Sequence, residues 1–162
     1  IRSPIAVVRA GAAEDLPAML EHYRAAFKPQ TNGFSFFEGA TAHSIEHLGL
    51  LTMMVQEALL QSVAPRPGEP ETIHVFPAWP RTWDVSFRLL ARGGFVVAAA
   101  MLDGCVAEVE IESRFGEECR LRNPWPAACR VENEDGDVGA RAAAAEVVAF
   151  DTRPGSRYRL HG

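Results

Sequence analysis

The sequence has almost no lysine: Lys28 is the only one among 16 basic residues, and the others are arginines. Acidic residues number 21, so the formal net charge is −5 at pH 7. Binding to nucleic acid requires a dense cationic face that can replace the counterions of the phosphates. This charge balance therefore excludes nucleic-acid binding as the main function, and we expect no nucleic-acid partner.

Long apolar runs are also lacking, because no stretch approaches the roughly 20 residues that span a bilayer. We therefore expect no membrane partner. The chain starts at Ile1 without a charged segment followed by an apolar one, the pattern of a signal peptide. A start without methionine indicates processing, proteolysis or trimming, so the sequence leaves the cellular location open and export remains compatible with it.

Cysteine is scarce and odd in number: only Cys105, Cys119 and Cys129 occur. An odd count cannot form a complete disulfide framework. A pair between Cys119 and Cys129 is one possibility, but we favour buried free thiols, because an unpaired cysteine behaves as a small apolar residue.

What the chain does contain is enough apolar material for a core. Its 162 residues are 48% hydrophobic and 23% charged, which excludes wholesale disorder. The pattern changes near residue 65. We expect a helical segment over residues 1–63, a proline-rich linker over 64–70, and short strands over 71–162. The predicted fold class is α+β.

Two helices are predicted in the first part. One runs from Asp15 to Phe27, with Pro17 in its first turn, and the other from Thr41 to Val63. Residues 48–60 of the second helix are apolar nearly all round, and such a helix must be enclosed. One neighbouring helix cannot enclose it. We therefore expect a larger helical body upstream in the same protein to be a partner of this chain.

The second part is typical of an antiparallel β-sandwich. Gly93-Gly94 and Asp103-Gly104 are hairpin turns by their residue types, and they flank an apolar strand at residues 95–102. In the next strand Ala107, Val109 and Ile111 alternate with glutamates, which predicts one buried face. Further strands are predicted at residues 72–78, 85–92, 128–133, 147–150 and 158–160.

We also expect a hairpin that closes over residues 115–117. It would place Glu112 opposite Arg120 and Glu110 opposite Arg122, and these pairs would set the register of the two strands.

The sharpest local motif is H-x-x-E-H, from His43 to His47. Two histidines one helical turn apart can bind zinc beside a catalytic glutamate. No third ligand is evident, so we favour ordinary histidines that line a polar pocket, and we expect no metal and no cofactor. Glu38, which follows two phenylalanines, has two interpretations: a proton-transfer group in a cleft, or the last residue of a helix-capping box that begins at Ser35.

The remaining patterns point less directly to a chemical function. The aromatic residues Phe76, Trp79 and Trp83 could stack on sugar rings, but we favour a role in filling the space between two domains. The acidic row at residues 108, 110 and 112 could bind calcium, but it is typical of a solvated face. Gly93-Gly94 lacks the remainder of a phosphate loop, and no G-x-S-x-G nucleophile motif is present.

Several segments in one order resemble the C-terminal region of glycoside hydrolase family 95, the α-L-fucosidase and α-L-galactosidase group. They are residues 59–62 (LLQS), 73–80 (IHVFPAWP), 83 (Trp), 90–96 (LARGGFV) and 119–122 (CRLR). Similar enzymes build a six-hairpin (α/α) barrel ahead of a β-sandwich, and they remove terminal fucosyl or galactosyl residues with inversion. The resemblance implies that residues 1–63 are the last barrel helices and 71–162 the sandwich.

The resemblance also implies a site. An Asp-Gly segment of the family aligns with Glu38-Gly39, so Glu38 would be the carboxylate on the base side of the reaction. We expect Phe34, His43 and His47 to bind the carbohydrate substrate. The acid and the other polar residues would lie upstream, so the isolated chain is expected to be inactive. The alternative that stays open is a carbohydrate-binding or structural β-sandwich module without catalysis.

Overall fold

The computed structural model describes residues 4–26, 28–29, 31, 35–38, 42–43 and 45–162. For residues 28–29, 35–38, 42–43 and 45–48 it describes the course of the backbone only. The chain forms two compact units. A helical unit comprises residues 1–59 and 77–80, and a β unit comprises residues 60–76 and 81–162. No helix among the described residues is long and apolar enough to cross a membrane.

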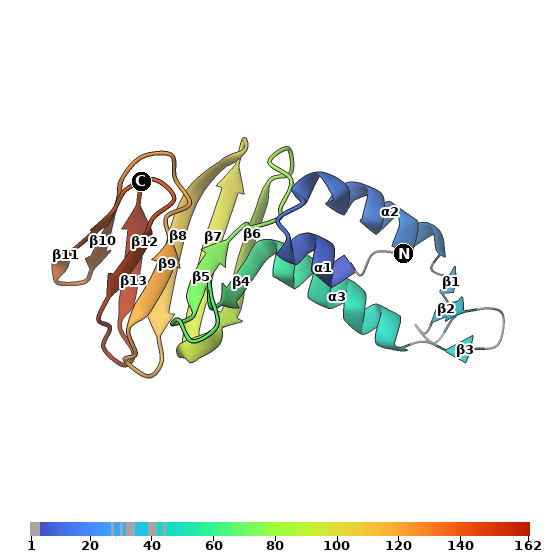
Figure 1. Ribbon diagram of the computed structural model, residues 1–162, viewed down its shortest axis with the longest axis horizontal. Coiled ribbons are helices and arrows are strands. Elements are labelled where there is room, and N and C mark those ends of the chain that lie inside the picture. Colours follow the sequence, from blue (N-terminus) through green and yellow to red (C-terminus); the bar gives the residue numbers. More distant parts are fainter. Residues whose placement is uncertain (1–3, 27, 30, 32–34, 39–41, 44) are drawn as a thin grey trace. The chain divides into compact units, whose positions relative to one another are not determined.

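Within its described residues, the helical unit forms three α-helices and a small sheet (Figure 1). The helices are α1 (Pro4–Arg9), α2 (Leu16–Ala26), which follows the short 3-10 turn η1 (Ala13–Asp15), and α3 (Ile45–Leu59). The short strands β1 (Lys28–Pro29), β2 (Ser35–Glu38) and β3 (Ala42–His43) pair side by side in that order. The predicted helix at 15–27 is confirmed as α2, whereas α1 and the small sheet were not predicted.

The core of the helical unit lies on one side of α3. Met54 and Ala58 of α3 are fully buried together with Val8 of α1 and Leu16 of α2. Arg9 and Glu57 join α1 to α3 at the surface, with guanidinium–carboxylate distances of 3.0 and 2.7 Å. In the described part of α3, Leu50 and Val55 are only half-buried and Met53 is 45% exposed. The described chain therefore leaves part of this apolar helix uncovered.

The predicted helix at 41–63 is too long at both ends. Residues 42–43 are a strand, and the helix stops at Leu59, where the chain continues directly as strand β4 (Leu60–Val63). Strand β4 pairs with β5 (Thr72–Val75) from Leu60 opposite Val75 to Val63 opposite Thr72. The segment 64–70 is therefore a loop inside the β unit, and the boundary between the units lies at Leu59/Leu60. The hydrogen bonds between β4 and β5 set this boundary. The apolar periodicity on which the helix prediction rested carries no information about such pairing.

The β unit consists of two sheets. The six-stranded sheet has the strand order β11-β10-β13-β8-β7-β6, and all its pairs are antiparallel. Its strands are β6 (Val85–Ala91), β7 (Phe95–Leu102), β8 (Cys105–Ser113), β10 (Cys129–Asn133), β11 (Gly136–Ala142) and β13 (Arg157–His161). The predicted strands that correspond to β6, β7, β8, β10 and β13 are confirmed to within a few residues. Strand β11 was not predicted.

The second sheet has four strands in the order β12-β9-β5-β4. Strands β9 (Cys119–Arg122) and β12 (Val147–Phe150) pair antiparallel, whereas β5 and β9 run parallel. The buried faces of the two sheets meet in one core. Phe150 of β12 lies 5.2 Å from Tyr158 of β13 between ring centroids, and Phe76 lies 5.2 Å from Phe87 of β6. The expected antiparallel sandwich is therefore present, with one parallel pair.

Turn chemistry explains where several strands end. Asp103 and Gly104 both have positive φ, 50° and 73°, which is the two-residue hairpin turn that their residue types predict. The β6–β7 connection is one residue longer, and it forms the short turn η2 (Arg92–Gly94). Strand β5 stops at Val75, short of the predicted Ala78, because Phe76 has φ 54°, which is incompatible with a strand.

The alternation in β8 is confirmed for Val109 and Ile111, which are fully buried, but it is wrong for Ala107, which is exposed. The register with β7 shifts between Ala100 opposite Glu108 and Met101 opposite Val106, so Ala107 is the extra residue of a β-bulge. The extra residue reverses the alternation on its N-terminal side, so Val106 is buried instead of Ala107.

The predicted hairpin over residues 115–117 is wrong, because β8 and β9 lie in different sheets. The actual partner of β8 is β13, which places Arg157 opposite Glu112 and Arg159 opposite Glu110. The corresponding ion pairs measure 3.7 and 3.3 Å. The prediction chose the next two arginines spaced two residues apart, whereas the fold uses an equally spaced pair that begins 45 residues after Glu112.

Candidate functional site

The predicted site residues all come from the segment between residues 34 and 47. Glu38 ends β2, His43 ends β3, and His47 belongs to the first turn of α3. Strands β2 and β3 pair antiparallel, with Phe36 opposite His43 and Glu38 opposite Ala42. Glu38 and His43 therefore belong to neighbouring strands of one small sheet. Phe34, and the side chains of the other three residues, lie outside the described part of the structure.

The course of the backbone tests two interpretations of this segment, the zinc motif and the helix-capping box. A zinc motif of the H-x-x-E-H type needs both histidines on one helix, but His43 is in a strand and α3 begins only at Ile45. The capping-box interpretation of Ser35 and Glu38 is wrong, because these residues form β2 and start no helix. Across the described residues no group of histidines, cysteines and acidic residues has the arrangement of a metal site.

The β unit contains a groove of about 430 Å³ near the β6–β7 turn. Its lining comes from several strands and loops: Ser62, Pro70, Glu71, Ile73, Arg92, Gly93, Gly94, Phe95, Phe115, Glu117, Glu118 and Arg120. Half of these residues carry a charged or hydroxyl side chain. Pockets that hold small molecules span roughly 300–1,000 Å³, so the groove has the size of a ligand site.

Phe115 is the most exposed large apolar side chain of the described residues, with 67% of its surface accessible. One side of its ring lies against the backbone of Gly94. A Cβ atom at Gly94 would come within 2.3 Å of the ring, so only glycine permits this packing. Gly94 also has φ 75°, which glycine adopts without strain. The sequence identified Gly94 as a turn residue but gave no signal that it supports an aromatic ring.

The loop that carries Phe115 is held by hydrogen bonds on both sides of the ring. The Arg114 amide donates to the Gly94 carbonyl at 3.1 Å, and the Gly116 amide donates to Ser113 Oγ at 3.0 Å. Ser113 and Thr152 are buried, and their hydroxyls lie 2.7 Å apart. Thr152 Oγ1 donates to the Glu117 carbonyl at 2.5 Å. This network anchors the backbone of the loop that carries the Phe115 ring.

The charges in the groove are largely paired. Arg92 Nη1 lies 2.6 Å from Glu71 Oε1, and Arg120 Nη1 lies 3.6 Å from Glu118 Oε2. Glu117 adds one further negative charge, so two arginines face three glutamates. Ser62 Oγ and Arg120 Nε are sheltered and have no hydrogen-bond partner among the described residues. The groove therefore combines an aromatic face, hydrogen-bonding groups and a small negative balance.

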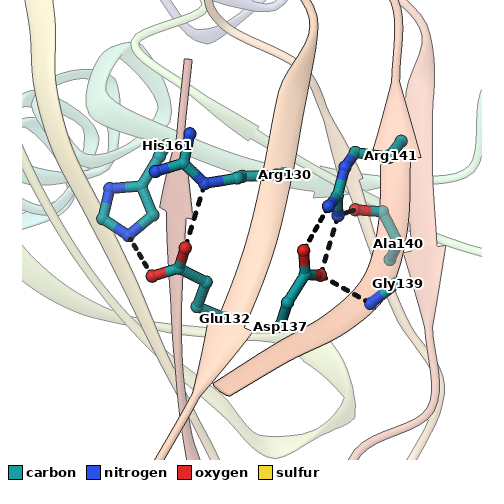
Figure 2. A network of polar contacts seen from close by, with 7 residues as sticks. All are labelled: Arg130, Glu132, Asp137, Gly139, Ala140, Arg141 and His161. Carbon is teal, nitrogen blue, oxygen red and sulfur yellow. Dashed lines mark hydrogen bonds and ion pairs between the residues drawn. The ribbon is translucent and has the colours of Figure 1, made fainter.

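The outer face of the six-stranded sheet carries a second polar cluster, at β10 and β11. Figure 2 shows Glu132 between Arg130 and His161, at 2.9 and 3.3 Å. Beside it Asp137 accepts hydrogen bonds from Arg141 and from the Gly139 amide. Arg130, Asp137 and Arg141 are exposed, and Glu132 and His161 are half-buried. The contact between Glu132 and His161 joins β10 to β13, whereas the other two pairs each lie within one strand. We interpret the cluster as an ionic ladder on a solvated face, as the acidic row of β8 was interpreted.

The Asp137–Arg141 pair gives a testable titration. The hydrogen bond from Arg141, aided by the Gly139 amide, lowers the pKa of Asp137 to about 2 from its usual 3.8. Because the folded pKa is depressed, the contribution to stability is present above pH 3.8 and is lost as the pH falls toward 2. In the variant Arg141→Gln the carboxyl pKa should rise toward 3.8. Carboxyl-carbon NMR measures it, and Arg153→Gln, which removes the 3.5 Å contact to Asp135, is the control.

Cys119 and Cys129 are buried free thiols, as expected, and Cys105 is exposed. Burial, with a smaller effect of Glu118, raises the pKa of Cys119 to about 12, and burial also raises the pKa of Cys129. A thiolate is the reactive form, so both buried thiols should be inert in the folded protein. Ellman's reagent should therefore label one thiol of the folded chain and three in denaturant. Cys105→Ser should abolish the labelling of the folded chain, and residual labelling would contradict this assignment.

Comparisons with known proteins agree with the fold. No curated protein matches the chain. The family model "Glycoside hydrolase family 95, C-terminal domain" matches residues 68–160. The match covers more than half of the chain and nearly all of the β unit, including the groove residues from Pro70 to Arg120. The chain therefore belongs to glycoside hydrolase family 95, whose C-terminal domain it contains.

Proposed function

We propose that this chain is the C-terminal portion of a fucosidase-like glycoside hydrolase that cleaves terminal glycosidic bonds with inversion. The observation that carries the proposal is the family match over residues 68–160. The helical unit adds support, because α3 keeps half-buried and exposed apolar residues on its described surface. Such residues suit a helix that packs against further helices, so we propose the upstream part of the same protein as its partner.

In this proposal Glu38 is the base-side carboxylate. An inverting glycosidase uses two carboxyl groups, roughly 6.5–9.5 Å apart, with the attacking water beside one of them and the leaving-group oxygen beside the other. Glu38 removes the proton from the water, and an acid from the upstream part protonates the leaving oxygen. Phe34, His43 and His47, which precede or follow Glu38 closely in the chain, bind the sugar. The chain alone lacks the acid, so it is not expected to turn over substrate.

The test uses the intact gene product that contains this chain. The wild-type enzyme should hydrolyse an aryl α-L-fucoside or α-L-galactoside, and proton NMR should detect the inverted anomer first. Glu38→Gln keeps the size of the side chain but removes the base, and it should lower kcat by roughly 10²–10⁴-fold. Glu108→Gln, on the exposed face of β8, is the matched control and should leave kcat unchanged.

Three results would separate the parts of the proposal. An unchanged kcat in Glu38→Gln would remove Glu38 from the mechanism while leaving the hydrolase assignment intact. Retention of anomeric configuration would contradict the inverting mechanism. No hydrolysis of either substrate by the intact wild-type enzyme would contradict the assignment to fucosidase-like activity.

A further inference from the structure

We propose that the groove beside Phe115 in the β unit is a carbohydrate-binding site specific for neutral sugars. The inference goes beyond hydrolysis, because it concerns binding without turnover. All of its residues belong to the β unit, whereas the candidate catalytic residue Glu38 belongs to the helical unit. The juxtaposition of an exposed aromatic ring on an anchored loop with paired charged groups carries the proposal.

The first element is the ring of Phe115. An exposed aromatic residue on a loose loop loses more conformational entropy when a ligand orders it than one on a loop that is already anchored. Phe115 is 67% exposed, yet its loop is tied to Gly94, Ser113 and Thr152 by hydrogen bonds. A flat apolar surface of this kind fits the C–H face of a pyranose ring.

The second element is the polar lining. A sugar presents several hydroxyl groups, each of which both donates and accepts hydrogen bonds. Arg92 and Glu71 offer a donor and an acceptor held 2.6 Å apart, so their positions are already set relative to each other. Arg120 and Glu118 form a second such pair in the lining, at 3.6 Å. Such a mixed lining suits a polyhydroxylated ligand better than an apolar one.

The third element is charge, which selects among sugars. Two arginines face three glutamates in the groove, so no unpaired positive charge is left for an acidic ligand. A sialylated, sulfated or phosphorylated sugar would meet net repulsion when it is desolvated there. The structure therefore assigns neutral saccharides to the groove and excludes anionic ones.

The test is a titration of the folded 162-residue chain, labelled with nitrogen-15, by two trisaccharides that share a lactose core. The neutral probe is 2′-fucosyllactose and the anionic probe is 3′-sialyllactose. The neutral probe should shift the amide signals of Gly93, Gly94 and Phe115 in a saturable manner, and the anionic probe should bind at least several-fold more weakly. Because the chain lacks the proposed catalytic acid, this result does not depend on the hydrolase assay.

Two variants locate the binding. Phe115→Ala should weaken binding of 2′-fucosyllactose by about tenfold, which corresponds to about 1.4 kcal/mol, because it removes the aromatic face on which the sugar ring stacks. Gly94→Ala keeps the Phe115 ring, but the new Cβ would lie 2.3 Å from the ring in its present position. The ring must therefore move, and binding should weaken. Leu102→Ala removes another exposed apolar side chain of the β unit, 53% accessible, and should leave binding unchanged.

The thermal midpoint of each variant shows whether a loss of binding reflects unfolding. If Gly94→Ala unfolds the chain, Arg92→Met replaces it as the second variant. Arg92 is exposed, so this change removes the ion pair with Glu71 without disturbing the core. No saturable shift with either trisaccharide would overturn the proposal. Binding that Phe115→Ala leaves unchanged, or a preference for the sialylated probe, would also overturn it.

Discussion

Replacing Leu121 with alanine should lower the free energy of unfolding of this chain by about 2–5 kcal/mol. Leu121 is fully buried at the centre of the four-stranded sheet, where β9 pairs with β12 on one side and with β5 on the other. The leucine side chain thus fills space between two packed sheets. Its removal costs the transfer free energy of the lost carbons and leaves a cavity that strands on both sides cannot close.

The matched control makes the same chemical change at the surface. Leu102, at the end of β7, is 53% exposed, so Leu102→Ala should change the free energy of unfolding by no more than about 0.5 kcal/mol. Urea denaturation monitored by tryptophan fluorescence measures both variants at equal protein concentration. Similar losses for the two variants would contradict the burial of Leu121.

Asn123→Asp should destabilise the chain by about 3 kcal/mol or more, although the two side chains have almost the same shape. Asn123 is buried, and its Nδ2 donates to the carbonyls of Ala127, Ala142 and Ala143 at 2.8, 3.2 and 2.9 Å. A carboxylate cannot donate. The aspartate would place a negative charge against three carbonyl oxygens and leave those oxygens without their donor.

The control is Asn133→Asp, because Asn133 uses its side chain as an acceptor only: the Asp135 amide donates to Oδ1 at 2.9 Å. A carboxylate can accept this bond, so this variant should stay close to the wild type. The defect of Asn123→Asp should shrink at low pH, because the protonated acid is neutral and can donate one hydrogen bond. A loss that does not depend on pH would contradict this explanation.

Much of the β unit follows from local sequence. Alternation identified the buried residues Val109 and Ile111, and residue types identified the turn at Asp103 and Gly104, because side-chain period and turn dihedrals depend on a few neighbouring residues. The family followed from an ordered set of short segments, which the match over residues 68–160 confirms. The bulge at Ala107 and the early end of β5 at Val75 could not be seen, since partner strands decide them.

The candidate sites also divide into one that the sequence predicted and one that only the folded structure revealed. Glu38, His43 and His47 were found from motif and resemblance, and they remain predictions for which the structure describes the backbone. The groove beside Phe115 had no signal in the sequence, because its residues come from segments between Ser62 and Arg120 that only folding brings together. Sequence spacing also gave Glu110 and Glu112 the wrong arginines, because it cannot tell which of two sheets a later strand joins.

The sequence by itself therefore indicated a helical part ahead of a β part, the buried positions Val109 and Ile111 of β8, and the family. Each of these depends on local pattern or on composition. The tertiary structure alone decided where α3 ends at Leu59, which strands share a sheet, and that Gly94 supports the ring of Phe115. These features depend on contacts between residues distant in the chain, whose free energy exists only once the backbone has folded.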